Sequence, residues 1–177
     1  MADLTLLKNE FSPYQKSLKE TSRDGEAFLC QSQREIYCFE DHERLRGKRF
    51  DALYIGKDDG IYCVEFKNSH YEEISKMQAE LEGKFCDSFD FLKGLFEAKN
   101  LKMQDYDFYF YIVWKDSSKD HERFNVRKNQ EEKGIYRRLR RCIDRWCEAN
   151  KKLRIQLKTN SKYYFLKEYK DLCKECR

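Results

Sequence analysis

Two short apolar segments separated by a turn constrain the fold of this chain more than any other feature. Residues 48–56 and 61–67 are rich in aromatic and branched side chains. The residues between them, 57–60, have the sequence Lys-Asp-Asp-Gly, which is typical of a tight turn. The pattern therefore predicts a β-hairpin. A three-residue loop would place Asp51 opposite Glu65, because both residues lie equally far from its centre.

Three charged side chains of this hairpin are expected on one face. Side chains alternate along a strand, so Glu65 and Lys67 point to the same side, and Asp51 on the partner strand joins them. Leu53 and Cys63 are among the apolar residues on the rest of that face. Unpaired charges at an apolar surface are costly, and carboxylates in this arrangement suit Mg²⁺, a hard cation that prefers oxygen ligands. The sequence therefore predicts a magnesium site at the edge of an apolar surface.

The spacing of these residues resembles the active-site signature of the PD-(D/E)XK nuclease superfamily, which includes RecB-like nucleases and Holliday-junction resolvases. Asp51 matches the first acidic position, Glu65 the second and Lys67 the lysine, while Phe50 stands where the family has proline. The resemblance implies that Asp51 and Glu65 hold Mg²⁺, for which Mn²⁺ can substitute, and that the Phe66 carbonyl is a further ligand. It also implies that Lys67 orients the attacking water or stabilises the developing charge.

The function implied by the resemblance is that of a metal-dependent deoxyribonuclease in DNA repair, recombination or defence. Its partner would be DNA. A junction-cutting resolvase, a restriction-type endonuclease and a RecB-like exonuclease all remain open. The resemblance also allows for a homodimer, because junction resolvases of this superfamily act as dimers.

The Glu-x-Lys part of the signature is not specific by itself, since charged residues make up 38% of the chain. It recurs at residues 82–84, 97–99, 131–133 and 168–170. The first three copies fall in helical patterns, where positions two apart do not face each other, and the last has Arg154 where the hairpin acid is needed. The alternative at residues 65–67 is an ordinary exposed hairpin with a cross-strand salt bridge, but apolar residues on both faces of this strand favour burial.

The order of expected elements indicates an α/β protein. The pattern predicts a helix over 14–33, strands over 35–40, 48–56 and 61–67, a helix from 71, a strand over 106–114 and a helix over 128–150. It also predicts a last strand within 156–169 that includes at least 163–166. A helical stretch over 88–99 either continues the helix from 71 or breaks from it. The order resembles the αβββαβ core of restriction-endonuclease-like proteins with a C-terminal helix and strand. It implies a three-layer α/β/α sandwich around a mixed central sheet, with residues 1–177 in a single domain.

Other polar residues are candidates for accessory roles. Nucleases of this type often use a further acid from the first helix, and Glu26 is the preferred candidate over Glu20 and Glu35. Gln78 resembles a glutamine that some RecB-like members place near the metal. The alternatives are a solvated surface position for Glu26 and a partly buried bystander for Gln78.

A basic group decorates the outward face of the helix expected at 128–150. The candidate nucleic-acid-binding residues in it are Arg137, Arg138, Arg141 and Arg145. Arginine side chains can grip phosphates with paired hydrogen bonds. The alternative is a solvated helix whose arginines pair with acidic residues of the same helix.

Two further interpretations of the chain remain. One is a catalytically inactive nucleic-acid-binding module of the same fold. The other is a zinc or iron–sulfur site ligated by cysteines, centred on Cys173 and Cys176 with Cys142 and Cys147 as further ligands. No apolar run approaches the roughly 18 residues of a membrane span, and the first residues lack a signal pattern, so we expect a cytoplasmic protein without membrane contact.

Overall fold

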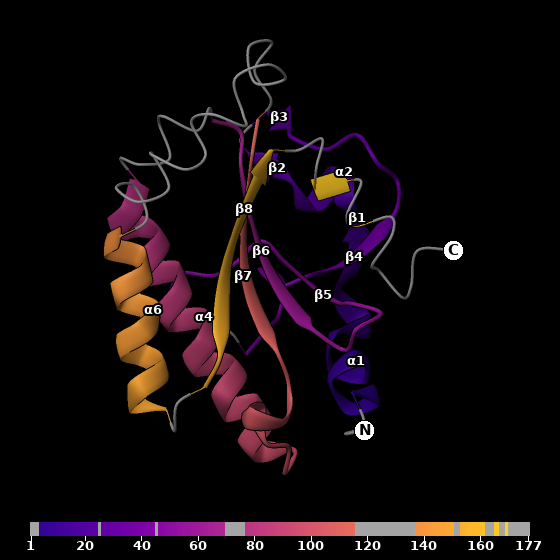
Figure 1. Cartoon of the computed structure of the whole chain (residues 1–177). Coiled ribbons are helices and arrows are strands. Elements are labelled where there is room, and N and C mark those ends of the chain that lie inside the picture. Colours follow the sequence, from indigo (N-terminus) through magenta and orange to yellow (C-terminus); the bar gives the residue numbers. More distant parts are fainter. Residues whose placement is uncertain are drawn as a thin grey trace.

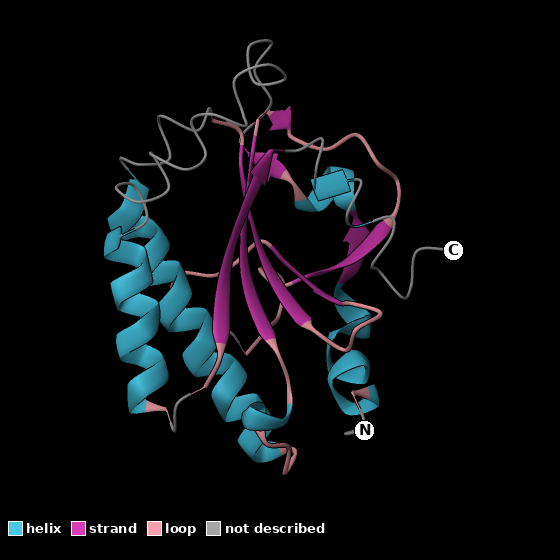
Figure 2. Ribbon diagram, viewed as in Figure 1, coloured by secondary structure: helices cyan, strands magenta, loops and turns pink. Residues whose placement is uncertain are grey.

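The computed structural model is a mixed α/β fold built around a six-stranded mixed sheet (Figures 1 and 2). The structure describes residues 4–24, 26–44, 46–69, 77–115, 137–150, 153–161, 165, 166 and 169. Its helices within these ranges are α1 (Thr5–Phe11), α2 (Leu18–Thr21), α4 (Gln78–Ala98) and α6 (Arg137–Ala149). The strands of the sheet are β1 (Gln15–Ser17), β4 (Glu35–Cys38), β5 (Ala52–Ile55), β6 (Ile61–Lys67), β7 (Phe108–Trp114) and β8 (Ile155–Ser161).

The sheet changes from antiparallel to parallel at β6. Its strand order is β1-β4-β5-β6-β7-β8, and the pairs from β1 to β6 are antiparallel, whereas β6, β7 and β8 run parallel. Parallel neighbours need a long crossover, and the helices α4 and α6 lie in the two crossovers that follow β6 and β7. Both helices therefore begin at the edge of the sheet where the parallel strands end (Figure 1).

The hairpin of β5 and β6 has the register that the sequence predicts. Ala52 pairs with Val64, so Asp51, just before β5, lies opposite Glu65 in the same register. The loop is closed by a hydrogen bond from the Gly56 N–H to the carbonyl oxygen of Gly60, at 2.8 Å. The last of the three residues between these glycines, Asp59, has a φ of 61°, which is typical of the three-residue hairpin loop.

The two faces of the sheet are buried in two separate apolar clusters. The first cluster includes Leu53, Ile55, Ile61 and Cys63 from the hairpin and the apolar stripes of α1, α4 and α6. The second lies on the opposite face and includes Tyr62, Val64 and Phe66, together with Leu18 of α2 and Phe165. The alternation predicted for the hairpin is confirmed, since β6 is buried on both faces.

The predicted helix over 14–33 is wrong. The structure has α1 before this segment, then a 3₁₀ turn (Ser12–Tyr14), β1, α2 and a small ribbon of β2 (Arg23–Asp24) and β3 (Ala27–Phe28). A capping box explains the break, because the side chains of Ser17 and Glu20 each bond the other's backbone N–H and start a new short helix.

The second half of the chain follows the prediction more closely. The stretch over 88–99 continues the preceding helix, and α4 is one element that buries Leu81, Phe85, Phe89 and Leu92. The expected strand over 106–114 is confirmed as β7 in the interior of the sheet.

Near the end of the chain the last strand falls in the predicted range 156–169 except for its first residue, but its expected extension to Phe165 and Leu166 is wrong. The strand is Ile155–Ser161, whereas Phe165 and Leu166 are helical. The Phe165 ring packs edge-on against Phe66, with 5.4 Å between centroids. Phe165 is therefore buried against the sheet without being part of a strand. Residues 70–76 and 128–136, where the sequence predicts helix, lie outside the described ranges. In the part of the chain that is described, no helix is both long and apolar enough to cross a membrane.

Candidate active site

The segment that leads into β5 is fixed by α4, and this positions Asp51. The Ser88 hydroxyl oxygen accepts a hydrogen bond from the Phe50 N–H at 3.0 Å, and the Asp87 carboxylate accepts one from the Lys48 N–H at 2.8 Å. Ser88 is fully buried, so its bond satisfies a backbone donor that water cannot reach. Two hydrogen bonds from α4 therefore fix the backbone just before Asp51.

Close packing around Phe50 and Gly47 supports the same segment. Phe50, which stands where the nuclease family has proline, is fully buried, and its ring centroid lies 4.8 Å from that of Phe110 and 5.6 Å from that of Phe89. Gly47 has a φ of +85°, and a Cβ there would lie only 2.6 Å from Asp87 Oδ2. Glycine suits this point because other residues are strained at such a φ and because a Cβ would displace the Asp87 carboxylate that bonds the Lys48 N–H.

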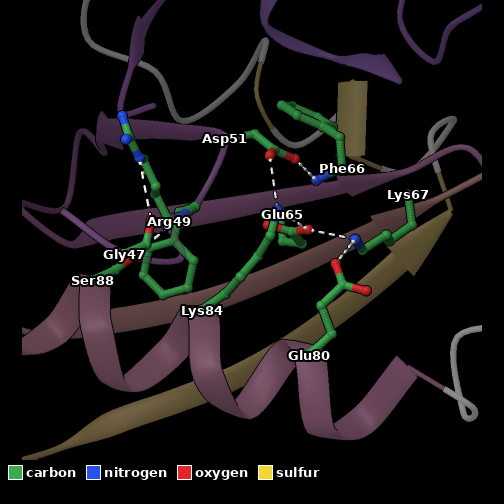
Figure 3. A network of polar contacts seen from close by, with 10 residues as sticks. Gly47, Arg49, Asp51, Glu65, Phe66, Lys67, Glu80, Lys84 and Ser88 are labelled. Atoms are coloured by element: carbon green, nitrogen blue, oxygen red, sulfur yellow. Dashed lines mark hydrogen bonds and ion pairs between the residues drawn. The ribbon is translucent and has the colours of Figure 1, made fainter. Parts of the chain in front are cut away.

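The two hairpin carboxylates meet beside two lysine ammonium groups (Figure 3). Asp51 Oδ2 accepts a hydrogen bond from the Phe66 N–H at 2.5 Å, and Asp51 Oδ1 lies 3.3 Å from Lys84 Nζ. Glu65 is fully buried, and its Oε1 accepts from Lys84 Nζ at 2.7 Å and lies 2.9 Å from Lys67 Nζ. Adjacent strands supply the carboxylates, whereas Lys84 comes from α4.

A third carboxylate forms the more open side of this network. Glu80, one turn before Lys84 on α4, accepts a hydrogen bond from Lys67 Nζ at 2.7 Å. Its side chain is 44% exposed, whereas that of Lys67 is 11% exposed. The Lys67 ammonium is therefore held between a buried and a solvent-facing carboxylate.

Burial has the largest effect on the pKa values of the two hairpin acids, Asp51 and Glu65. Loss of hydration raises the pKa of Asp51 well above its usual value, and the charge of Glu65 raises it further against the effect of Lys84. Loss of hydration also raises the pKa of Glu65, although Lys84 and Lys67 oppose the shift. At Glu80 the hydrogen bond from Lys67 lowers the pKa. The site therefore resists carrying two uncompensated negative charges.

Both lysines are ammonium groups at neutral pH. Burial disfavours the charged form of Lys67, but the charges and hydrogen bonds of Glu65 and Glu80 outweigh burial and raise its pKa. Burial likewise opposes the charge of Lys84, and Asp51 with Glu65 outweighs it, so its pKa is raised too. Neither amine is suited to act as a base, whereas both can donate hydrogen bonds or stabilise negative charge.

The donor atoms of this site fit a divalent cation. A single nitrogen, Lys84 Nζ, is within 3.3 Å of Asp51 Oδ1 and 2.7 Å of Glu65 Oε1, so the two carboxylates converge on one cation position. Glu65 Oε2 is buried and has no hydrogen-bond donor among the residues that the structure describes. Within the same residues, no group of three or more His, Cys, Asp or Glu side chains surrounds such a position. The two carboxylates, one of them with an orphaned oxygen, are a minimal set of hard ligands.

The residues assigned from the motif are brought together, whereas the expected accessory acid is not at the end of a helix. Asp51, Glu65 and Lys67 share one network, and Phe66 contributes its N–H to Asp51. Glu26 is exposed in the turn between β2 and β3. Its placement on a first helix is wrong because the short helix α2 ends at Thr21 and the β2–β3 ribbon follows.

The other candidate acids have local roles or exposed positions. Glu20 caps α2 through Ser17, and Glu35 is exposed at the start of β4. Gln78 is the first residue of α4 and is half-buried, so it lies at the same end of the helix as Glu80.

The four candidate arginines lie on α6 and are all exposed, as expected from their place on its outward face. Arg138 Nε lies 2.8 Å from Glu82 Oε1 of α4, so the start of α6 is next to the helix that carries Lys84. Arg145 Nε donates to the carbonyl oxygen of Arg141 at 3.3 Å.

Sequence reasoning missed Glu80 and Lys84. The two residues are four apart, which on a helix surface is the spacing of an ordinary salt bridge, and nothing in that spacing indicates a contact with a distant hairpin. Their position next to the buried residues Leu81 and Phe85 is the signal that could have placed them at the margin of the core.

The cysteines proposed as metal ligands have other neighbours in the described part of the chain. Cys142 Sγ lies 3.6 Å from Cys86 Sγ across the contact of α6 and α4, and burial raises the pKa of the Cys86 thiol to about 12. Cys147 is half-buried against the first cluster. Cys173 and Cys176 lie outside the described residues.

Comparisons with protein-family models, curated proteins and solved structures found no match for this chain.

Proposed function

We propose that this protein is a metal-dependent nuclease of the PD-(D/E)XK type that hydrolyses phosphodiester bonds of DNA. The observation that carries the proposal is the convergence of two buried carboxylates, Asp51 and Glu65, on one cation position. Burying two such charges is costly unless they are compensated, and active sites are common places for this arrangement. The amine of Lys67 lies at the side of Glu65, as the motif requires.

The order and pairing of the elements support the finer architecture that we propose with this function. After α1, β1, α2 and the β2–β3 ribbon, the chain runs through β4, β5 and β6 to α4 and β7. This order from β4 onward supports the proposed αβββαβ core, to which α6 and β8 are added. Apolar clusters cover both faces of the sheet, which is compatible with a three-layer α/β/α sandwich. A ligand site at the carboxyl end of parallel strands is also usual for open α/β sheets.

In the proposed reaction, Asp51 and Glu65 would hold Mg²⁺ or Mn²⁺, with the Phe66 carbonyl as the further ligand expected from the motif. Such an ion would supply an acidified water and offset negative charge on the phosphate. Asp51 is kept in position by the Phe66 N–H, and Glu65 by its burial. The oxygen of a water molecule forms a bond to phosphorus and gives up a proton to solvent, while the bond to the 3′ oxygen breaks and that oxygen takes up a proton. The products therefore carry 5′-phosphate and 3′-hydroxyl ends.

Lys67 stabilises charge in this scheme rather than removing a proton. Its pKa is raised by Glu65 and Glu80 in spite of burial, so it remains an ammonium throughout the neutral range. The two carboxylates fix its direction, and an ammonium held in place costs little reorganisation when negative charge builds on a phosphate oxygen.

The start of α6 is the proposed contact surface for the DNA backbone. Arg137 and Arg138 are exposed there, and the ion pair from Arg138 to Glu82 places them beside the first turns of α4. Arg141 and Arg145 continue the positive charge along the helix. Phosphate contacts of this kind add affinity without reading sequence.

Cleavage assays test the proposal directly. Wild-type protein with Mg²⁺ or Mn²⁺ is incubated with plasmid, linear duplex, single-stranded and branched DNA, and EDTA is added to parallel samples. We expect cleavage that requires the metal and leaves 5′-phosphate ends. Asp51→Asn keeps an acceptor for the Phe66 N–H but removes the charge, so it should abolish cleavage and the rise in melting temperature on adding Mn²⁺.

The matched control is Glu97→Gln, which makes the same type of change at an exposed position of α4. It should cleave like the wild type. If every substrate stays intact at high concentration of folded wild-type protein, or if Asp51→Asn cleaves as well as the control, the catalytic proposal is wrong.

A second candidate, a nucleic-acid-binding module without catalysis, is favoured by one specific observation. The ammonium of Lys84 lies at the cation position between Asp51 and Glu65, so the site is neutralised in part without a metal. Such a module would bind DNA through α6 and show neither cleavage nor a melting shift with Mn²⁺.

A further inference from the structure

Lys84 lies in the first half of α4, and its side chain extends to the two carboxylates of the hairpin. Its ammonium bridges Asp51 Oδ1 at 3.3 Å and Glu65 Oε1 at 2.7 Å, and its side chain is 16% exposed (Figure 3). The motif that identifies the site does not include this residue.

The two lysines of the site have different positions. Lys67 contacts Glu65 and the more exposed Glu80, so it lies to one side of the hairpin acids. Lys84 contacts Asp51 and Glu65, which are the two groups that a divalent cation would need. Lys84 and a bound cation would therefore compete for one position.

The charges of the network support this competition. With its acids ionised, the network joins three carboxylates to two ammonium groups, which leaves one net negative charge. A divalent cation added beside Lys84 would give the network a net positive charge. A divalent cation that replaces the ammonium of Lys84 makes the network neutral, because Lys67 and the cation together balance the three carboxylates. Replacement is thus the arrangement that leaves the whole network, including the more exposed Glu80, without net charge.

We propose that Lys84 is an exchangeable counter-cation, whose ammonium holds Asp51 and Glu65 together until a divalent cation displaces it. The proposal rests on the proposed function, since it concerns the same metal position. Lysine suits this role because its compact charge sits on a flexible stem that can swing toward solvent. Lys84 is then a positioning residue that sets the affinity of the site for the metal.

The test is a titration of the full chain with Mn²⁺, in which free Mn²⁺ is measured by electron paramagnetic resonance. Lys84→Met removes the competing charge and keeps an unbranched side chain of similar length. We expect its dissociation constant for Mn²⁺ to fall roughly tenfold, the size of one moderate charge interaction. Lys93→Met, the same substitution at a half-buried position of α4 outside the network, should bind Mn²⁺ like the wild type.

Melting temperatures give a second measurement that separates exchange from a purely structural role. In EDTA, Lys84→Met should melt below the wild type because Asp51 and Glu65 lose a counter-charge. Saturating Mn²⁺ should remove most of this difference. A structural role alone would leave the deficit unchanged by Mn²⁺ and would overturn the proposal. If Lys84→Met does not fold, Lys84→Gln is used in the same two measurements.

The remaining outcomes separate this proposal from the nuclease assignment. If the wild type binds Mn²⁺ and the variant binds it no more tightly, exchange is overturned and the nuclease proposal stands. If neither protein binds Mn²⁺, both proposals fail. If only the variant binds, Lys84 excludes the metal permanently, which overturns exchange and favours the binding module.

Discussion

The two oxygens of the Glu65 carboxylate have different surroundings, although the whole residue is buried. Oε1 accepts from both Lys67 and Lys84, whereas Oε2 has no donor among the described residues. An unpaired buried oxygen costs free energy that the fold must recover elsewhere. Such a residue is expected where a ligand completes the coordination, and this is why Glu65 is central to the metal proposal.

The raised pKa values of the hairpin acids predict how metal affinity depends on pH. Burial raises the pKa of Asp51 and of Glu65, so protons compete with the metal at a higher pH than they would at exposed carboxylates. Lowering the pH from 8 to 5, which stays above the ordinary carboxylate pKa of about 4, should therefore weaken Mn²⁺ binding, by up to about tenfold per pH unit for each proton displaced. Titrations with Mn²⁺ at fixed ionic strength measure this, and a constant affinity over that range would contradict it.

His42 predicts a separate dependence of stability on pH. Its ring is buried, its Nε2 lies 3.3 Å from Glu10 Oε1, and its Nδ1 accepts a hydrogen bond from the Arg44 N–H at 3.3 Å. Burial lowers its pKa, in spite of the opposing charge of Glu10. As the pH falls through the ordinary pKa of about 6.5, His42 therefore becomes protonated in the unfolded chain while it stays neutral in the folded chain.

The free energy of unfolding should fall as the pH drops from 7.5 to 5.5, at no more than about 1.4 kcal/mol per pH unit from this residue. Above pH 7.5 the ring is neutral in both states and contributes no slope. His42→Gln should flatten the dependence. Urea denaturation at several pH values measures it, and an equal slope in both proteins would exclude His42 as the cause.

Among residues, local geometry explains what could be predicted and what could not. The opposition of Asp51 and Glu65 follows from the alternation of a strand and the length of one loop, which short sequence patterns determine. The approach of Lys84 depends on how a helix packs on the finished sheet. No pattern near Lys84 contains that information.

Among elements, the contact of α4 and α6 supports the helix that carries Glu80 and Lys84. Trp146 of α6 donates its indole N–H to Asp90 Oδ1 of α4 at 2.8 Å. Its ring packs against Phe89, with 5.6 Å between centroids. The apolar residues of α6 recur at regular helical spacing, a pattern that can be read from the sequence, and Leu139, Cys142, Ile143 and Trp146 are buried.

Substitutions of Trp146 test this contact. Trp146→Phe keeps most ring packing and loses one hydrogen bond, so it should lower the free energy of unfolding by about 1 kcal/mol. Trp146→Ala should lower it by about 3–5 kcal/mol because it leaves a cavity. Urea denaturation measures both, with exposed Arg140→Ala as a control that changes little. Equal losses in the two variants would show that the ring does not pack as described.

The elements before β4 show where sequence patterns fail. Residues with near-helical spacing over 14–33 predicted one helix, but Ser17 and Glu20 cap a new short helix and Ser22 bonds backbone groups on either side of the β2–β3 ribbon. These side chains compete with helical hydrogen bonds. The periodic pattern instead reflects burial of Leu18 and Leu29 against the second cluster.

For the whole molecule, one sheet separates two apolar clusters and takes part in both. Tyr62 and Val64 belong to one cluster, and their neighbours Ile61 and Cys63 belong to the other. Both clusters depend on the same strands, so unfolding of these strands removes the packing of both. The described part of the chain should therefore unfold as one unit.

Unfolding measured by two methods tests this cooperativity. Trp114 and Trp146 both lie in the first cluster, so their fluorescence reports its packing, whereas far-ultraviolet circular dichroism reports the backbone of the whole sheet. We expect the two urea midpoints to coincide. Separate midpoints would show that the two faces of the sheet lose their structure independently.

The tight loop between β5 and β6 has a practical consequence. It lies at the far end of the hairpin from the acids, about 20 Å away for the six residue steps from Lys57 to Asp51. Lys57 is exposed, so a fluorescent label in its place would extend into solvent. Such a label would lie on the same hairpin as the carboxylates without touching them, so the cation position would stay open to metal.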